Sequence, residues 1–213
     1  MNATRIARFG FFAIGIVLLG AALSLVLYNL NEDQKSGEQA QNLLAEVKRE
    51  IPDETQPTEA KKYDLFSEYE TEPAIEEPIL EIDGQTYIGV IAIPELGIEL
   101  PVISEWSYPN LKSAPCRYQG TAFDRDMILI AHNYQTHFGR ISELHSGSEI
   151  VFTDAAGKIY AYEVNNIENI VGTDIESMEF GSADSWDLTL FTCTISGQSR
   201  VTVRAFLKPE EEN

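Results

Sequence analysis

The first residue type that could do covalent chemistry is cysteine, and the chain has two. Cys193 ends the apolar run Asp187–Cys193, which is typical of a β-strand. A thiol at a strand end is partly accessible, and its thiolate is a strong nucleophile. Free cysteines are more often buried and inert, and extracellular ones usually pair. Cys193 is therefore a candidate nucleophile, and a Cys116–Cys193 disulfide is the alternative.

A histidine occupies the equivalent position in another strand. His132 ends the apolar run Met127–His132. If both strands end at one rim of a sheet, an imidazole and a thiol meet there, which supplies a nucleophile and a general acid. A surface histidine at a strand end is the alternative. His137 and His145 follow in the next loop and helix, and we interpret them as surface or packing residues.

An arginine follows the cysteine at hairpin distance. Arg200 lies seven residues after Cys193, at the start of the next apolar run. If residues 194–199 form a hairpin loop, Arg200 returns to the same rim, where a guanidinium could bind a carbonyl or stabilise an oxyanion. A solvated strand arginine is the alternative. Arg204 lies on the same face of the strand and is the competing candidate.

The strands that must position these residues follow from short apolar runs separated by Gly, Pro and Asn. The expected strands are Tyr87–Ile93, Ile98–Ile103, Met127–Ala131, Glu149–Thr153, Lys158–Ile170, Leu188–Cys193 and Arg200–Leu207. Asp154–Gly157 has the composition of a hairpin turn. Asn110–Ser113 and Phe138–Leu144 are expected short helices. Strands at this spacing predict an all-β fold, a closed β-barrel with short helical insertions.

The chain before these strands predicts an anchor and a spacer. Residues 9–31 carry no charge and could span a bilayer as an N-terminal transmembrane helix, with a cleaved signal peptide as the alternative. Arg5 and Arg8 precede this run and acidic residues follow it, which predicts a cytoplasmic N-terminus and an extracellular remainder. The expected divisions are residues 1–31 (anchor), 32–82 (acidic extracellular stalk) and 83–213 (catalytic barrel).

The stalk is expected to be largely solvated. Apolar residues recur at helical spacing over residues 38–51, which predicts a short helix that ends at Pro52. The following segment is rich in Glu, Thr and Pro and cannot bury enough surface to fold alone. In the alternative, aromatic and apolar residues of this segment dock on the domain, over its active site. These residues are Tyr63, Leu65, Phe66 and Tyr69.

Composition and missing motifs exclude several function classes. The chain has 213 residues and a formal net charge of −19, which disfavours nucleic acid as a partner because phosphates would be repelled. The sequence contains no phosphate-binding glycine loop and no H-E-x-x-H, so nucleotide-binding and zinc-protease functions have no support. No metal ligands are predicted among the site residues.

The motifs around these residues resemble those of the sortase family. Thr189–Cys193 followed by Arg200–Ala205 looks like the family signature T-L-x-T-C…R-x-x-V-x-A. Ile128–Asn133 is similar to the strand that ends in the family's histidine, although Ala131 stands where a glycine is common. Tyr87–Pro94 resembles the family's first strand. The resemblance covers about residues 86–208 and implies an eight-stranded sortase-type barrel.

The resemblance implies a membrane-anchored cysteine transpeptidase of the Gram-positive cell surface. Cys193 would attack the carbonyl at the cut in an LPxTG-like sorting signal and form a thioester. His132 would protonate the leaving amine and later deprotonate the incoming amine. Arg200 would hold the substrate and the oxyanion. The partners would be surface proteins that carry sorting signals and an amino nucleophile of a peptidoglycan precursor or pilin, with attachment to the cell wall.

The resemblance also implies substrate contacts and leaves some questions open. Candidate substrate-binding residues lie beside the nucleophile, beside the histidine and in the loop 173–186. They are Thr192, Ile130, Phe191, Met178, Phe180 and Trp186. No cofactor is expected, but some family members bind calcium through acidic loop residues, which this chain also has. The alternatives are a cysteine peptidase that only hydrolyses, and a non-catalytic extracellular binding module with a Cys116–Cys193 disulfide.

Overall fold

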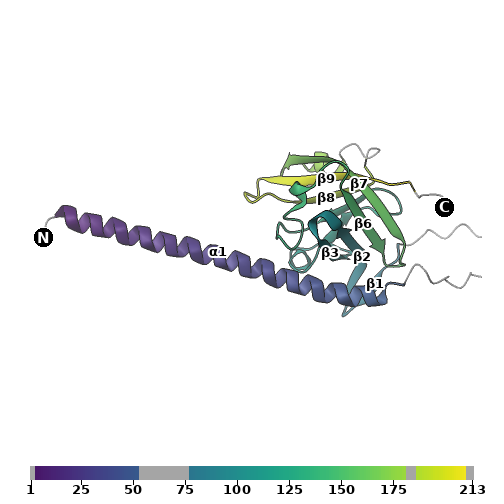
Figure 1. The fold of residues 1–213 in the computed structure, drawn as a ribbon, viewed down its shortest axis with the longest axis horizontal. Helices are drawn as coiled ribbons and strands as arrows, with labels where there is room; N and C mark the ends of the chain where they lie inside the picture. Colours follow the sequence, from purple (N-terminus) through teal and green to yellow (C-terminus); the bar gives the residue numbers. More distant parts are fainter. Residues whose placement is uncertain (1–2, 53–76, 181–185, 210–213) are drawn as a thin grey trace, which may run out of the picture. The chain divides into compact units, whose positions relative to one another are not determined.

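The computed structural model describes residues 3–52, 77–180 and 186–209. The chain divides into two compact units, residues 1–35 and 36–213. One helix, α1 (Ala3–Glu50), passes from the first unit into the second (Figure 1). The aromatic part of the expected stalk, from Tyr63 to Tyr69, lies outside the described residues, so its docking stays a prediction.

The first part of α1 is a continuous apolar helix. Its large side chains, such as Phe11, Leu18 and Leu23, are exposed. The helix is long and apolar enough to cross a membrane by length and composition. It is therefore a candidate membrane span, as the sequence predicted.

The last part of α1 belongs to the second unit. Ala40, Leu44 and Val47 are buried, and their spacing places them on one face of the helix. Leu44 and Val47 pack in one apolar cluster with residues such as Tyr87 and Ile103 of the barrel wall. The helix predicted over residues 38–51 is thus the end of a longer helix, and its apolar face is covered by strands rather than solvated.

Eight strands form a closed ring. Neighbours around the ring follow the order β2-β3-β4-β5-β8-β9-β7-β6, and the pairing of β2 with β6 closes it. Strands β7, β8 and β9 lie side by side in Figure 1. The eight strands are β2 (Gln85–Ile93), β3 (Ile98–Ile103), β4 (Cys116–Gln119), β5 (Met127–Ile130), β6 (Glu149–Asp154), β7 (Ile159–Val171), β8 (Leu188–Cys193) and β9 (Ser199–Leu207). The predicted closed eight-stranded barrel is confirmed.

Two strands were not among the expected segments. One is β4, which pairs with β5 across a register shift next to Arg117. The other is β1 (Leu80–Ile82), which lies outside the ring and forms a hairpin with β2. The two residues between them, Asp83 and Gly84, both have positive φ, as a tight two-residue hairpin turn requires.

Short helices interrupt the strands. They are η2 (Pro94–Leu96), α2 (Tyr108–Leu111), η3 (Ile141–Glu143) and α3 (Ile175–Phe180). The expected helices Asn110–Ser113 and Phe138–Leu144 overlap α2 and η3. The predicted turn at Asp154–Gly157 is confirmed, because the Asp154 carboxylate accepts hydrogen bonds from the amides of Ala156 and Lys158 at 2.9 Å each. These insertions connect the strands without interrupting the ring.

The barrel interior is filled by side chains that alternate along the strands. Leu129 of β5, Leu190 of β8 and Val203 of β9 are fully buried in one large cluster. Because successive strand residues point to opposite faces, the intervening residues of these strands face outward. Cys193, Phe191 and Arg200 therefore share the outer face of the barrel wall.

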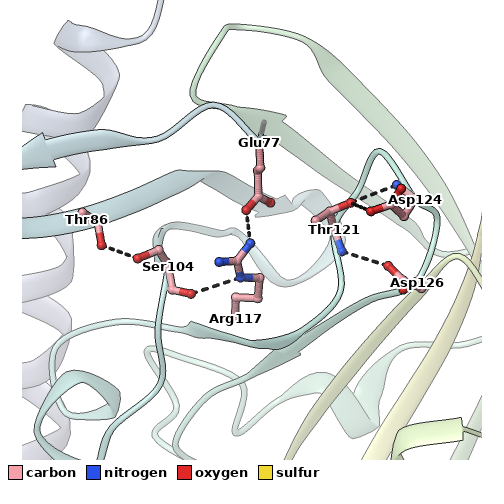
Figure 2. A network of polar contacts seen from close by, with 7 residues as sticks. All are labelled: Glu77, Thr86, Ser104, Arg117, Thr121, Asp124 and Asp126. Carbon is pink, nitrogen blue, oxygen red and sulfur yellow. Dashed lines mark hydrogen bonds and ion pairs between the residues drawn. The ribbon is translucent and has the colours of Figure 1, made fainter. Parts of the chain in front are cut away.

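A polar network fastens the start of the second described segment to the barrel (Figure 2). Arg117 of β4 donates a hydrogen bond through Nη1 to the Glu77 carboxylate and through Nε to the Ser104 carbonyl, the latter at 3.1 Å. The Ser104 hydroxyl in turn contacts the Thr86 hydroxyl. This network ties the residues before β1 to β2, β3 and β4.

Candidate active site

The thiol of Cys193 lies at the end of β8 and is partly exposed. In the antiparallel pair of β8 and β9, Cys193 is the register partner of Arg200. The backbone closes the loop between them through a hydrogen bond from the Thr194 amide to the Ser199 carbonyl at 2.9 Å. The expected hairpin therefore brings Arg200 back to the rim that carries Cys193.

His132 reaches the same rim from the neighbouring strand. Strands β5 and β8 are parallel, with Ile130 in register with Phe191. The Ala131 amide donates to the Phe191 carbonyl at 3.3 Å, so the alignment continues past the end of β5. His132 follows Ile130 by two residues just beyond the end of β5, and Cys193 follows Phe191 by two residues at the end of β8, so both lie at the same rim. The structure thus brings together the three residues that the sequence singled out.

Thr192 links the two strands immediately before these residues. Its buried hydroxyl donates to the Ala131 carbonyl at 2.8 Å. Residues 131 and 192 directly precede the histidine and the cysteine, so this bond fixes the relative height of the two side chains. Thr192 was expected to contact substrate through its backbone, and its side chain here has a different, bridging function.

The imidazole of His132 is half-buried, and burial lowers its pKa, with a smaller contribution from the nearby charge of Lys112. Its ring packs against Tyr134 with centroids 5.0 Å apart. A lowered pKa favours the neutral imidazole near neutral pH. The ring can then accept a proton from a thiol and return it to a leaving group.

Arg200 and Arg204 have different environments. The Arg200 guanidinium is partly exposed, and its Nη1 donates to the carbonyls of Gly197 and Ser199 at 3.1 and 3.2 Å. Arg204 is 1% exposed, and burial lowers its pKa. It donates to the Thr189 hydroxyl at 2.8 Å and to the carbonyls of Ser177 and Met178 at 2.5 and 3.1 Å. Arg204 therefore fastens α3 to the barrel, whereas Arg200 lies opposite the thiol.

The second cysteine is remote from the first. Cys116 of β4 is register partner of Ile130, and β5 separates β4 from β8. Two strand spacings put the backbones of Cys116 and Phe191 about 10 Å apart, beyond the reach of a disulfide. Both thiols are free, and burial raises the pKa of Cys116 to about 12. The geometry therefore disfavours the disulfide and leaves Cys116 as an inert core residue.

Three of the expected substrate-binding residues gather beside the thiol. Phe191 of β8, Met178 of α3 and Ile130 of β5 belong to one apolar cluster on the outer face, together with Ile128 and Ile170. Phe191 and Met178 are buried within it, and Ile130 is partly exposed. This cluster lies along the strands that lead to Cys193 and His132.

Trp186, another expected contact, is not among the members of this cluster. Trp186 stacks on Phe206 with ring centroids 5.1 Å apart. Phe206 lies six residues along β9 from Arg200, roughly 20 Å away at about 3.3 Å per residue. The structure therefore places Trp186 near the opposite end of the strands from the thiol. Phe180 ends α3, and its side chain lies outside the described residues.

Sequence reasoning missed an aromatic series that extends from the same cluster. Tyr118 of β4 packs edge-on against Phe191 at 5.5 Å and stacks with Trp106 at 6.0 Å. The Tyr118 hydroxyl donates to the Glu179 carboxylate of α3 at 2.6 Å. Trp106 and Tyr108 are exposed. A short bulged strand such as β4 has no periodic signal that could have indicated this arrangement.

Comparison with solved structures finds sortases. A sortase D5 transpeptidase from Clostridium perfringens matches with a TM-score of 0.51 and 24% identity, over 58% of this chain and 79% of that one. Sortase C1 from Streptococcus agalactiae matches with a TM-score of 0.51 and 23% identity, over 62% and 72%. Sortase C from Clostridium perfringens SM101 matches with a TM-score of 0.50 and 20% identity, over 89% and 99%. At these identities the likeness concerns the fold.

Comparison of the sequence identifies the family. None of the curated proteins matches the chain significantly. The profile of the sortase domain matches residues 91–208, which is more than half of the chain and includes β5, β8 and β9. With the barrel and the match together, the chain belongs to the sortase family of cysteine transpeptidases.

Proposed function

We propose that this protein cleaves an LPxTG-like sorting signal near the carboxyl end of a surface protein and transfers that protein, through the new carbonyl at the cut, to an amino nucleophile of the cell wall or of a pilin. Cys193 is the nucleophile, His132 the general acid and base, and Arg200 the residue that holds the substrate carbonyl. One observation carries the proposal. The pairing of β8 with β5 and β9 brings these three side chains to one rim.

The first half-reaction forms a thioester. The neutral imidazole of His132 takes the thiol proton, and the Cys193 sulfur attacks the scissile carbonyl carbon. The oxyanion of the tetrahedral intermediate is bound by the Arg200 guanidinium, which requires it to turn from its contacts with Gly197 and Ser199. The C–N bond then breaks, and His132 protonates the departing amine.

The second half-reaction is the reverse with a new amine. The incoming amine attacks the thioester carbon, His132 accepts its proton, and the C–S bond breaks to form a new amide. The Cys193 thiolate then regains the proton from His132. When water replaces the amine, the product is a free carboxylate. The same residues therefore serve the hydrolytic alternative, and only the acceptor distinguishes the two.

Substrate recognition is expected on the outer face next to the rim. The apolar cluster of Phe191 and Met178 lies under the strands that end at the nucleophile, and its partly exposed members, Ile130 and Tyr118, offer the apolar surface there. An extended peptide with a leucine and a proline before the cut could place the leucine and proline side chains along this cluster.

Attachment to the membrane completes the proposal. The apolar part of α1 would cross the cell membrane once, with Arg5 and Arg8 on the cytoplasmic side and the barrel outside. The proteins that it acts on would then be surface proteins that carry sorting signals. Carbonate extraction of membranes and protease accessibility of the barrel in whole cells and spheroplasts test this topology.

The decisive experiment uses the full chain in detergent with a library of pentapeptide sorting signals, with and without an amine such as triglycine. We expect an amine-dependent ligated product and a thioester that mass spectrometry detects at Cys193. Cys193→Ala should abolish the thioester. His132→Ala should slow turnover by about 10²–10⁴-fold while peptide binding persists. Hydrolysis without any ligated product would instead identify a cysteine peptidase.

Calcium is proposed to be dispensable. Several acidic loop residues already accept hydrogen bonds from protein donors. Asp124 and Asp126 bind Thr121, and Glu95 binds Ser148 (Figure 2 shows the first two). Among residues 3–52, 77–180 and 186–209, no three His, Cys, Asp or Glu side chains gather as a metal site would require. Ligation rates in calcium and in EDTA should agree within about twofold, and a larger loss in EDTA would contradict this.

A further inference from the structure

One polar side chain of α1 is buried between two loops that flank His132. Ser36 is 4% exposed although it is a small polar residue on a helix. Its hydroxyl donates to the Lys112 carbonyl, and it lies 3.2 Å from Nε2 of His137, which is fully buried. Lys112 follows α2, and His137 lies in the loop after β5. A single hydroxyl therefore connects the helix to both loops.

The backbone of α1 approaches the second loop closely at the next residue. A Cβ added to Gly37 would lie 2.7 Å from Cγ2 of Thr136. Non-bonded carbon atoms do not approach each other so closely, so a larger residue at position 37 would have to displace the Thr136 side chain. The turn of α1 formed by Ser36 and Gly37 is thus packed directly on residues 136 and 137.

The loop after β5 transmits this contact to His132. The Phe138 amide donates to the His132 carbonyl at 3.3 Å, and the amides of His137 and Gly139 donate to the Tyr134 carbonyl at 3.0 and 2.8 Å. The Tyr134 ring packs between His137 at 5.6 Å and His132 at 5.0 Å. A displacement of His137 would therefore move Tyr134 and, with it, the wall against which the His132 imidazole rests.

We propose that Ser36 is a positioning residue for His132. Ser36 acts on His132 through His137 and Tyr134. Its hydroxyl also holds the loop that contains Lys112. The inference rests on the proposed function of His132. It gives the buried part of α1 a task in the reaction, because this turn fixes the orientation of the imidazole toward Cys193. Small misplacements of a catalytic group cost up to about a hundredfold in rate.

Several ionisable groups face His132, and each is part of the same arrangement. Lys112 comes from the loop after α2, Tyr134 from the loop after β5, and Cys193 and Arg200 from β8 and β9. His137 lies behind Tyr134. A substitution at Ser36 displaces Lys112 and Tyr134 without removing any charge. Its effect on a pH profile therefore reports geometry rather than a lost charge.

The kinetic test compares variants of the full chain in detergent in the ligation reaction. Ser36→Ala and His137→Leu should lower kcat about tenfold with KM within twofold, because neither residue contacts substrate. His137→Gln, whose amide can occupy the position of Nε2, should retain most of the rate. Gln41→Ala is the matched control. It removes another contact of the same helix, to the Glu99 carbonyl of β3 at 3.1 Å rather than to the loops of Lys112 and His137.

A second readout does not depend on ligation. Alkylation of Cys193 by iodoacetamide, followed by intact mass from pH 5 to 9, reports the thiolate, and the buried Cys116 should not react. Ser36→Ala should shift this profile in the direction of His132→Ala, and Gln41→Ala should leave it unchanged. An effect of His132→Ala without one of Ser36→Ala overturns this inference alone. No effect of His132→Ala overturns the proposed thiol–imidazole pair as well.

Equal losses of kcat in Ser36→Ala and Gln41→Ala, with matching losses of thermal stability, would also overturn the inference. Such losses would mean that Ser36 only helps to pack the helix against the barrel. A rate for His137→Gln as low as that of His137→Leu would show that the polar contact with Ser36 is not what matters.

Discussion

At the scale of single residues, the same side-chain type has different functions at neighbouring positions. Cys193 is partly exposed at a strand end, whereas Cys116 is fully buried with a raised pKa. Arg200 lies opposite the thiol, whereas Arg204 is enclosed by its hydrogen-bond partners. Burial and partners, rather than residue type, separate the candidate catalytic member of each pair from the structural one.

The two arginines lead to opposite predictions. Arg200→Ala should lower kcat by about 10²–10³-fold, because it removes the donor to the oxyanion, with little change in the free energy of unfolding. Arg204→Ala should lower the free energy of unfolding by about 2–4 kcal/mol, because Thr189, Ser177 and Met178 lose their donor. Ligation kinetics and urea unfolding of both variants are the measurements. The reverse ranking of activity losses would show that Arg204 is the substrate-binding arginine.

The lowered pKa of His132 predicts a pH dependence of stability. Its folded pKa lies below the ordinary value of about 6.5, because burial and Lys112 disfavour the imidazolium. The unfolded chain then binds more protons than the folded one between the two pKa values. The free energy of unfolding therefore falls as the pH falls through 6.5 toward the folded pKa.

Urea titrations of the wild type and of His132→Gln at pH 7.5 and 5.5 measure this effect. The wild type should lose more stability between the two pH values than the variant, whose amide does not titrate. Other ionisable groups contribute equally to both proteins. A larger loss in the variant would mean that the folded state raises the pKa of His132.

At the scale of elements, the end of α1 is part of the wall that it covers. Its apolar residues pack with β2, β3 and the chain around α2. Leu44→Ala should lower the free energy of unfolding by about 2–3 kcal/mol, because it opens a cavity at this interface. Asn42→Ala, on the exposed side of the same turn, is the matched control and should change it by less than about 0.5 kcal/mol. Equal effects of the two substitutions in urea unfolding would contradict the packing.

Most of the strands were predictable because apolar runs and turn residues mark them. β3 and β8 have the predicted bounds, and β9 differs by one residue. β4 was missed because Cys116–Gln119 is short, polar and bulged, and most of its stability comes from its neighbour β5. The Asp83-Gly84 dipeptide is a hairpin signal that could have indicated β1.

The position of the candidate site residues at one rim was predictable, but the contacts behind them were not. The strand-end positions of His132, Cys193 and Arg200 follow from local pattern alone. Ser36 could not be found in this way, because residues 31–37 are polar and interrupt the apolar spacing on both sides. Its proposed function rests on a contact between residues 101 positions apart in the sequence. Only the packed structure reveals such contacts.

At the scale of the whole molecule, the boundary between the two compact units falls within a helix. Residues 1–35 form one unit, and the second begins at Ser36. Removal of residues 1–35 should leave a barrel that melts within a few degrees of the full chain. Removal of residues 1–50 also deletes Leu44 and Val47, each worth about 2 kcal/mol, and should lower Tm by about 8 °C or more. Equal melting temperatures, measured by circular dichroism, would show that the helix end is dispensable.

The parallel pairing of β5 with β8 has a consequence for the order of folding. Strands that are consecutive in the chain, such as the antiparallel pair β2 and β3, can pair across a short connection. The parallel strands β5 and β8 are instead separated by residues 131–187, which include β6 and β7. Such non-local pairings form late, because the entropy of closing a long loop precedes the gain from contacts. The histidine is thus present on an incomplete chain well before the cysteine joins it. The rim that carries both residues is complete only after the last two strands, β8 and β9, have joined the barrel.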